Sequence, residues 1–121
     1  MNQPSPRIRE LTQSMWKKKF YAVFWEGKGA DLAPLLAEHL EYMIAVEREG
    51  KMLASGPLDF GNSSDGMTVL RVDSEAEARE IAQRDPFIRN GVRGFSIREW
   101  MVMEGSFSVR VNFSDRSIDI S

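Results

Sequence analysis

The segment from Lys18 to Glu26 constrains the fold more than any other part of this chain. It is aromatic, β-branched and almost continuously apolar, which is typical of a central strand covered on both faces. Its two faces carry Phe20, Ala22 and Phe24 on one side, and Tyr21, Val23 and Trp25 on the other. A strand of this kind needs neighbours in a sheet and packed material on each face.

A helix is predicted after the two glycines that follow this strand. Asp31 is a suitable N-cap, and Pro34 falls in the first turn, where its missing N–H costs little. Gly50 supplies a left-handed C-cap. Between them the apolar residues at helical spacing are Leu32, Leu35, Leu36, Leu40 and Met43.

The remaining elements complete a β-α-β-β-α-β order. Ser74 and Glu77 form a capping box that opens a helix from residue 75 to about 83, and Asp85-Pro86 ends it. The predicted strands are residues 51–60, interrupted at Ser55-Gly56-Pro57, then 67–73 after a turn at 61–66, and finally Phe95 to Met103. This order is the split βαβ arrangement and predicts an α+β, ferredoxin-like fold with an antiparallel sheet.

Three regions are expected along the chain. Residues 1–15 are a polar lead-in with a short helical turn around Ile8 to Leu11, and residues 16–104 form the ferredoxin-like domain. Residues 105–121 alternate in the manner of an added C-terminal strand or short hairpin, which can reach a neighbouring subunit. Two helices cover one sheet face, and the other face also carries apolar side chains, so we expect a homodimer formed sheet against sheet.

Composition removes several classes of function. The chain has no cysteine and one histidine, which excludes thiolate and multi-histidine metal sites but not an all-oxygen site, and no metal is predicted. A net charge of −2 argues against a nucleic-acid partner, and the basic run Lys17 to Lys19 is read as a solvated strand entrance. No apolar run approaches the length of a membrane span, and no signal-peptide centre is present, so we predict a cytoplasmic protein without a membrane partner.

The single histidine is the most informative polar residue. His39 falls within the apolar stripe of the first helix. It is either a general acid or base, or a core histidine that is hydrogen-bonded to a backbone carbonyl. Asp85 is either its partner or an ordinary Asp-Pro turn, and only the fold can bring the two together. Ser55-Gly56-Pro57 combines a hydroxyl with a close backbone approach, or marks a β-bulge. Phe87 and Trp100, with Trp25, line an apolar pocket or belong to the core.

Four short motifs resemble the YCII-related family in order and spacing across residues 16 to 104. They are the H-L-x-Y segment from His39 to Tyr42, the G-x-x-x-x-S-G-P stretch from Gly50 to Pro57, the D-P-F at Asp85 to Phe87, and the aromatic Trp100. The resemblance implies a ferredoxin-like fold that dimerises as an α/β barrel. It also implies a cleft with a His–Asp pair, here His39 and Asp85, proposed as an active site.

What the resemblance implies about activity is a small-molecule enzyme without a cofactor. One characterised branch of the family dehydrochlorinates a chlorinated hydroxyhydroquinone, and the fold is similar to that of muconolactone isomerase. The prediction is therefore a cofactor-independent lyase or isomerase acting on a small polar-aromatic or lactone-like molecule. His39 and Asp85 are its catalytic pair, and the substrate-binding residues are Ser55, Gly56, Pro57, Phe87 and Trp100. The alternative is a non-catalytic homodimer that binds a small ligand or serves as a regulatory module.

Overall fold

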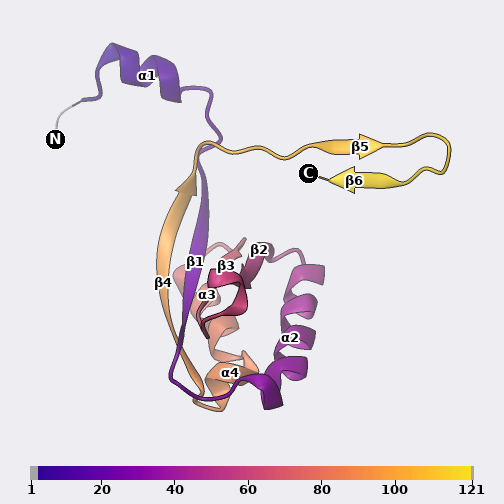
Figure 1. The fold of residues 1–121 in the computed structure, drawn as a ribbon. Coiled ribbons are helices and arrows are strands. Elements are labelled where there is room, and N and C mark those ends of the chain that lie inside the picture. Colours follow the sequence, from indigo (N-terminus) through magenta and orange to yellow (C-terminus); the bar gives the residue numbers. More distant parts are fainter. Residues whose placement is uncertain (1–2, 121) are drawn as a thin grey trace. The chain divides into compact units, whose positions relative to one another are not determined.

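The computed structural model describes residues 3–120, which fall into two compact units. One unit is residues 19–101, and the other combines the segments that flank it. Figure 1 shows the elements of both. The elements of the larger unit, of which the first and last extend one residue beyond it, are β1 (Lys18–Gly27), a 3₁₀ turn (Ala33–Leu35), α2 (Leu36–Arg48), β2 (Met52–Pro57), a second 3₁₀ turn (Asp59–Gly61), β3 (Gly66–Leu70), α3 (Glu75–Gln83), α4 (Pro86–Arg89) and β4 (Arg93–Val102).

The four strands form one sheet in the order β2-β3-β1-β4. Strand β3 runs antiparallel to both of its neighbours, with Trp25 opposite Gly66 on one side and Pro57 opposite Gly66 on the other. The central position of β1 agrees with its continuously apolar sequence. The predicted α+β fold with a ferredoxin-like strand order is confirmed.

The core lies between the sheet and its helices. Every second residue of β1, beginning with Tyr21, faces this layer and is almost completely buried. Ala78 and Ala82 of α3 are fully buried, because small side chains one turn apart let a helix approach a sheet closely. The buried core residues are Tyr21, Val23, Trp25, Val46, Leu70, Ala78 and Ala82.

Helix α2 divides its apolar residues between two environments. His39, Met43 and Val46 are buried at the i, i+4, i+7 spacing. Leu36 and Leu40, which the helical stripe predicts to face the core, remain 44% and 49% exposed. They differ from the prediction because this side of α2 borders a cavity instead of packed side chains. The end of the helix is as predicted, with Gly50 at a φ of +76°.

Strand β2 corrects the sequence-based interpretation of Ser55-Gly56-Pro57. These residues do not interrupt the strand but form its second half, with Ser55 opposite Thr68. Proline is tolerated because β2 lies at the edge of the sheet, where an N–H is not needed for a further partner. The register irregularity lies earlier, between Met52 and Ala54, and the extended segment ends at Pro57 instead of continuing to residue 60.

Asp85-Pro86 ends α3 as predicted and also begins another helix that the sequence did not indicate. The side chain of Asp85 accepts a hydrogen bond from the backbone N–H of Phe87 at 3.4 Å, which caps the single turn of α4. After α4 the last strand begins at Arg93, two residues before the predicted start at Phe95.

The flanking unit holds one helix and one hairpin. Helix α1 (Pro6–Thr12) includes the predicted turn and is capped by the Ser5 hydroxyl, which accepts from the N–H of Ile8 at 3.2 Å. Strands β5 (Val109–Val111) and β6 (Ile118–Ile120) pair antiparallel, so the predicted C-terminal hairpin is present. Within residues 3–120, no helix has both the length and the apolar character needed to cross a membrane.

Candidate active site

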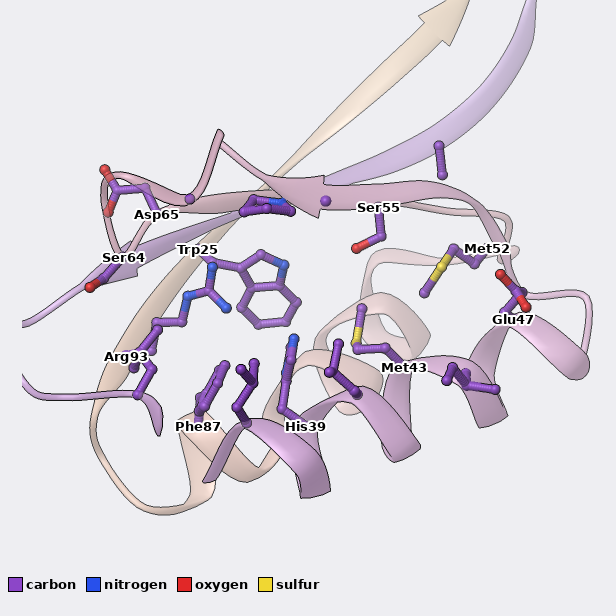
Figure 2. A pocket seen from close by; sticks show the side chains of 18 of the residues that line it. Trp25, His39, Met43, Glu47, Met52, Ser55, Ser64, Asp65, Phe87 and Arg93 are labelled. Carbon is purple, nitrogen blue, oxygen red and sulfur yellow. The ribbon is translucent and has the colours of Figure 1, made fainter. Parts of the chain in front are cut away.

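A cavity of about 790 Å³ lies between α2 and the helix-facing side of the sheet. Its wall is built by β1, α2, β2, α4, the start of β4 and residues 61–65, all within the larger unit. A volume of this size is typical of small-molecule sites. Figure 2 shows the side chains that line it, and we refer to it as the His39 cavity.

His39 lines this cavity, and the buried Asp85 is its hydrogen-bond partner. The Nδ1 of His39 lies 2.6 Å from Oδ1 of Asp85, a carboxylate with no solvent exposure. A carboxylate accepts hydrogen bonds, so Nδ1 carries the proton and donates it to Asp85. The other ring nitrogen, Nε2, then has its lone pair free, and Figure 2 shows a ring nitrogen of His39 pointing toward Trp25 and the interior of the cavity.

Phe87 fixes the plane of the imidazole. Its ring stacks on His39 with centroids 4.3 Å apart and planes inclined by 17°. Phe87 follows Asp85 by two residues in the turn of α4, so one short element supplies both the hydrogen-bond partner and the stacking partner of His39. The histidine is therefore held in one tautomer and one orientation.

A chain of three polar groups crosses the sheet beside this pair. Trp25 Nε1 donates to Thr68 Oγ1 at 2.8 Å, and Thr68 Oγ1 lies 2.7 Å from Ser55 Oγ. Thr68 is fully buried, and Ser55 is its remaining side-chain partner among the described residues, so we assign the Thr68 hydroxyl as the donor to Ser55. The Ser55 hydroxyl proton then remains free for an acceptor in the cavity, toward which Figure 2 shows this side chain directed.

The structure brings most of the predicted site residues to one cavity. Gly56 and Pro57 line it together with His39, Ser55 and Phe87. Trp100 does not: it lies in a separate shallow hollow with Ala22, Phe24 and Met67. The reason is strand alternation, because Phe95 and Ile97 of β4 pack on the helix-side core and the even-numbered residues point to the opposite face. The roles of all these residues in substrate binding stay predictions.

Arg93 is a further cavity residue that sequence reasoning missed. It is 94% buried, and its Cζ lies 5.6 Å from the ring centroid of Trp25 and 5.3 Å from that of Phe87. Burial lowers the pKa of Arg93, and the charges of Asp85 and Asp65 oppose that shift. Had the last strand been extended back to residue 93, alternation would have placed this arginine on the same face as Phe95.

Asp65 was also missed, and it shapes the cavity from the turn before β3. Its Oδ1 accepts a hydrogen bond from the backbone N–H of Gly27 at 2.8 Å, which ties this turn to the end of β1. A lone aspartate in a glycine- and serine-rich turn gives no sequence signal for such a role. In the part of the chain that the structure describes, no group of three His, Cys, Asp or Glu residues is arranged to hold a metal ion.

Comparison of the sequence with known proteins identifies the family of the chain. Residues 19–101 match the sequence profile of the YCII-related domain, which covers more than half of the chain. The protein YjpA of Bacillus subtilis strain 168, described as uncharacterized, is 32% identical over 65 residues, which span 54% of this chain and 74% of that protein. The chain therefore belongs to the YCII-related family.

Proposed function

We propose that this protein is a cofactor-independent lyase or isomerase that moves a proton on a small polar-aromatic or lactone-like molecule. The observation that carries the proposal is the 2.6 Å contact between His39 and the fully buried Asp85, with the second ring nitrogen facing the His39 cavity. This is the arrangement of a general base whose tautomer is fixed by a carboxylate.

The chemistry that this pair supports is abstraction of a proton from carbon. Nε2 of His39 takes the proton, and Asp85 stabilises the imidazolium that forms. The imidazolium then returns the proton to another carbon, which is an isomerisation, or a leaving group departs from the adjacent carbon, which is an elimination. Ser55 donates to the substrate oxygen on which negative charge develops.

The form of the pair supports a catalytic role over a structural one. A core histidine is satisfied by a neutral backbone carbonyl, whereas burying a carboxylate costs several kcal/mol unless its charge is compensated. The second oxygen of Asp85, Oδ2, is buried without a hydrogen-bond partner among residues 3–120. A fold that only needed to fill this position would be more stable with a neutral group.

The experiment is deuterium exchange, because it detects proton abstraction before the full reaction is known. A panel of hydroxylated aromatic acids and unsaturated lactones is incubated with the protein in D₂O, and loss of C–H signals is followed by NMR. We expect exchange with at least one compound, slowed ~100-fold or more in His39→Ala because general acid–base catalysis typically supplies a factor of 10²–10⁴.

The matched control is Glu38→Gln, which changes an exposed neighbour on the same helix and should leave the exchange rate unchanged. Circular dichroism shows that each variant is folded. A folded His39→Ala protein that exchanges at the wild-type rate contradicts the proposal.

The alternative is a non-catalytic small-ligand-binding module, and one observation favours it. The two acids that line the cavity, Glu47 and Asp65, lie at opposite ends of it in Figure 2, and neither lies beside His39. A reaction that needs two different proton-transfer groups would lack the second. This alternative predicts saturable binding from the same panel, with every ligand recovered chemically unchanged by mass spectrometry and with no deuterium incorporated.

A further inference from the structure

The guanidinium of Arg93 is a buried cation that contacts two aromatic rings but, among residues 3–120, no carboxylate. Nε is inaccessible and makes no hydrogen bond, and no carboxylate oxygen among residues 3–120 lies within 4.0 Å of the guanidinium. A buried charge is costly unless it is paired, and arginine keeps its charge at any physiological pH. Figure 2 shows the guanidinium beside the indole ring of Trp25.

Each of the two acids near Arg93 has its Oδ1 engaged elsewhere. Asp85 accepts from His39, and Asp65 accepts from the backbone of Gly27. Both attract the arginine through space without reaching it. The terminal N–H groups of Arg93 therefore remain available as donors toward the cavity.

The fold makes room for this guanidinium. Gly66 lies on β3 opposite Trp25, and a Cβ atom added there would lie 2.5 Å from Nη2 of Arg93. The aromatic rings of Trp25 and Phe87 flank the group at distances at which a cation is attracted to a ring. The Arg93 side chain is confined by the space beside Gly66 and by the two rings. It therefore loses little further conformational freedom when a ligand binds, which favours affinity.

We propose that the His39 cavity binds a small cyclic molecule through a carboxylate that pairs with the terminal nitrogens of Arg93. The planar fork of arginine matches a carboxylate with two parallel hydrogen bonds. A monoanion is favoured over a phosphate dianion because one cation, Arg93, shares the cavity wall with two acids, Glu47 and Asp65.

The position of the carboxylate site relates it to the catalytic pair. Phe87 contacts both Arg93 and His39, so an anion held by Arg93 places the ligand ring within reach of Nε2. Pairing with Arg93 would also reduce the repulsion between the carboxylate and the negative charge that develops when a proton leaves carbon. This relation rests on the proposed function, whereas carboxylate binding itself does not.

The experiment compares benzoate with benzamide, its neutral analogue of nearly equal shape, and with phenyl phosphate. Binding to the full chain is followed through the NMR signals of His39, the one histidine of the sequence. We expect benzoate to bind at least tenfold more tightly than benzamide, because hydrogen bonds to charged groups are the strong ones. Phenyl phosphate should bind more weakly than benzoate.

The variant Arg93→Gln should remove the preference for benzoate over benzamide. Its matched control is Arg98→Gln, which removes one positive charge from the opposite face of the same strand and should keep the preference. Gly66→Ala provides a second variant, because the added methyl displaces Nη2 while leaving the charge in the protein. This variant should weaken the binding of benzoate and leave the binding of benzamide unchanged.

Equal binding of benzoate and benzamide to the wild-type protein overturns the proposal, with no variant needed. Tighter binding of phenyl phosphate, or a preference that survives in folded Arg93→Gln, also overturns it. The two proposals fail separately. If the protein shows no preference for benzoate but catalyses deuterium exchange that depends on His39, the carboxylate site is refuted and the proposed function stands. If it prefers benzoate but catalyses no exchange, the proposed lyase or isomerase activity is refuted and the carboxylate site stands.

Discussion

At the scale of single residues, Asp85 has two structural roles. Its Oδ1 accepts from His39 and caps α4 through the N–H of Phe87, so one oxygen sets both the tautomer of the histidine and the start of the helix that carries its stacking partner. Asp85→Asn keeps the shape of this group but allows an amide N–H to donate to Nδ1. His39 would then carry its proton on Nε2 and lose its capacity as a base.

We expect Asp85→Asn to slow deuterium exchange ~100-fold or more, comparable to the loss of general acid–base catalysis, while the protein remains folded. The ¹⁵N NMR signals of the imidazole measure the cause directly, because they distinguish a protonated Nδ1 from a protonated Nε2. An unchanged tautomer together with an unchanged exchange rate would show that Asp85 does not act through His39.

The identities of the site residues were accessible from the sequence to different degrees. His39 and Asp85 were singled out from their sequence positions, and the family resemblance favoured their functional interpretation. Their contact could not be derived, because only packing of α2 against α4 brings them together. Arg93 was lost through a two-residue error at the start of β4. Thr68 gave no signal, because a threonine within a strand looks the same whether it faces solvent or relays a hydrogen bond to Ser55.

At the scale of elements, Tyr42 ties α2 to α3. Its hydroxyl donates to the carbonyl of Ile81 at 2.8 Å, and burial raises the pKa of Tyr42, with opposition from the charge of Arg84. Because the folded state favours the neutral phenol, this group's contribution to stability is complete below its ordinary pKa of 10.0 and is lost as the pH rises above it.

Tyr42→Phe should lower the free energy of unfolding by about 1 kcal/mol at neutral pH, the usual net value of one hydrogen bond. It should also flatten the decline of stability above pH 10, since no phenol remains at this position to ionise. Urea unfolding at several pH values measures both effects. Equal stability of the two proteins at neutral pH would show that the bond contributes nothing.

The elements that the sequence predicted best have explicit chemical boundaries. Helix α3 was predicted with its observed bounds, because Ser74 caps its start and Asp85-Pro86 stops it. Strand β2 was misread, because Gly56-Pro57 is a breaker in a central strand but is tolerated at an edge, and edge position is a property of the whole sheet. The single turn of α4 is too short to show helical periodicity.

At the scale of the whole molecule, the face of the sheet opposite the His39 cavity is covered at Phe20, which is fully buried, and carries an apolar hollow elsewhere. Ala22, Phe24, Met67 and Trp100 line a shallow apolar hollow there, and Trp100 is 42% exposed. Arg98 and Glu99 border the same hollow. A twofold axis through such a face brings the same apolar patch of two copies together, so that a residue of one copy meets a different residue of the patch on the other, and the reverse.

We therefore expect a homodimer with this face as its interface, and Trp100→Glu should dissociate it, because a buried carboxylate would then lie among apolar side chains. Light scattering after size exclusion should give twice the chain mass of 13.8 kDa for the wild-type protein and the single mass for the variant. Phe60→Glu, a change at an aromatic residue that is fully exposed in the second 3₁₀ turn, is the control that should stay dimeric. A wild-type protein with the mass of one chain would show that no dimer forms. A Trp100→Glu variant that remains a dimer would show that another surface joins the two copies. Loss of the dimer with benzoate binding retained would further show that one chain completes the carboxylate site.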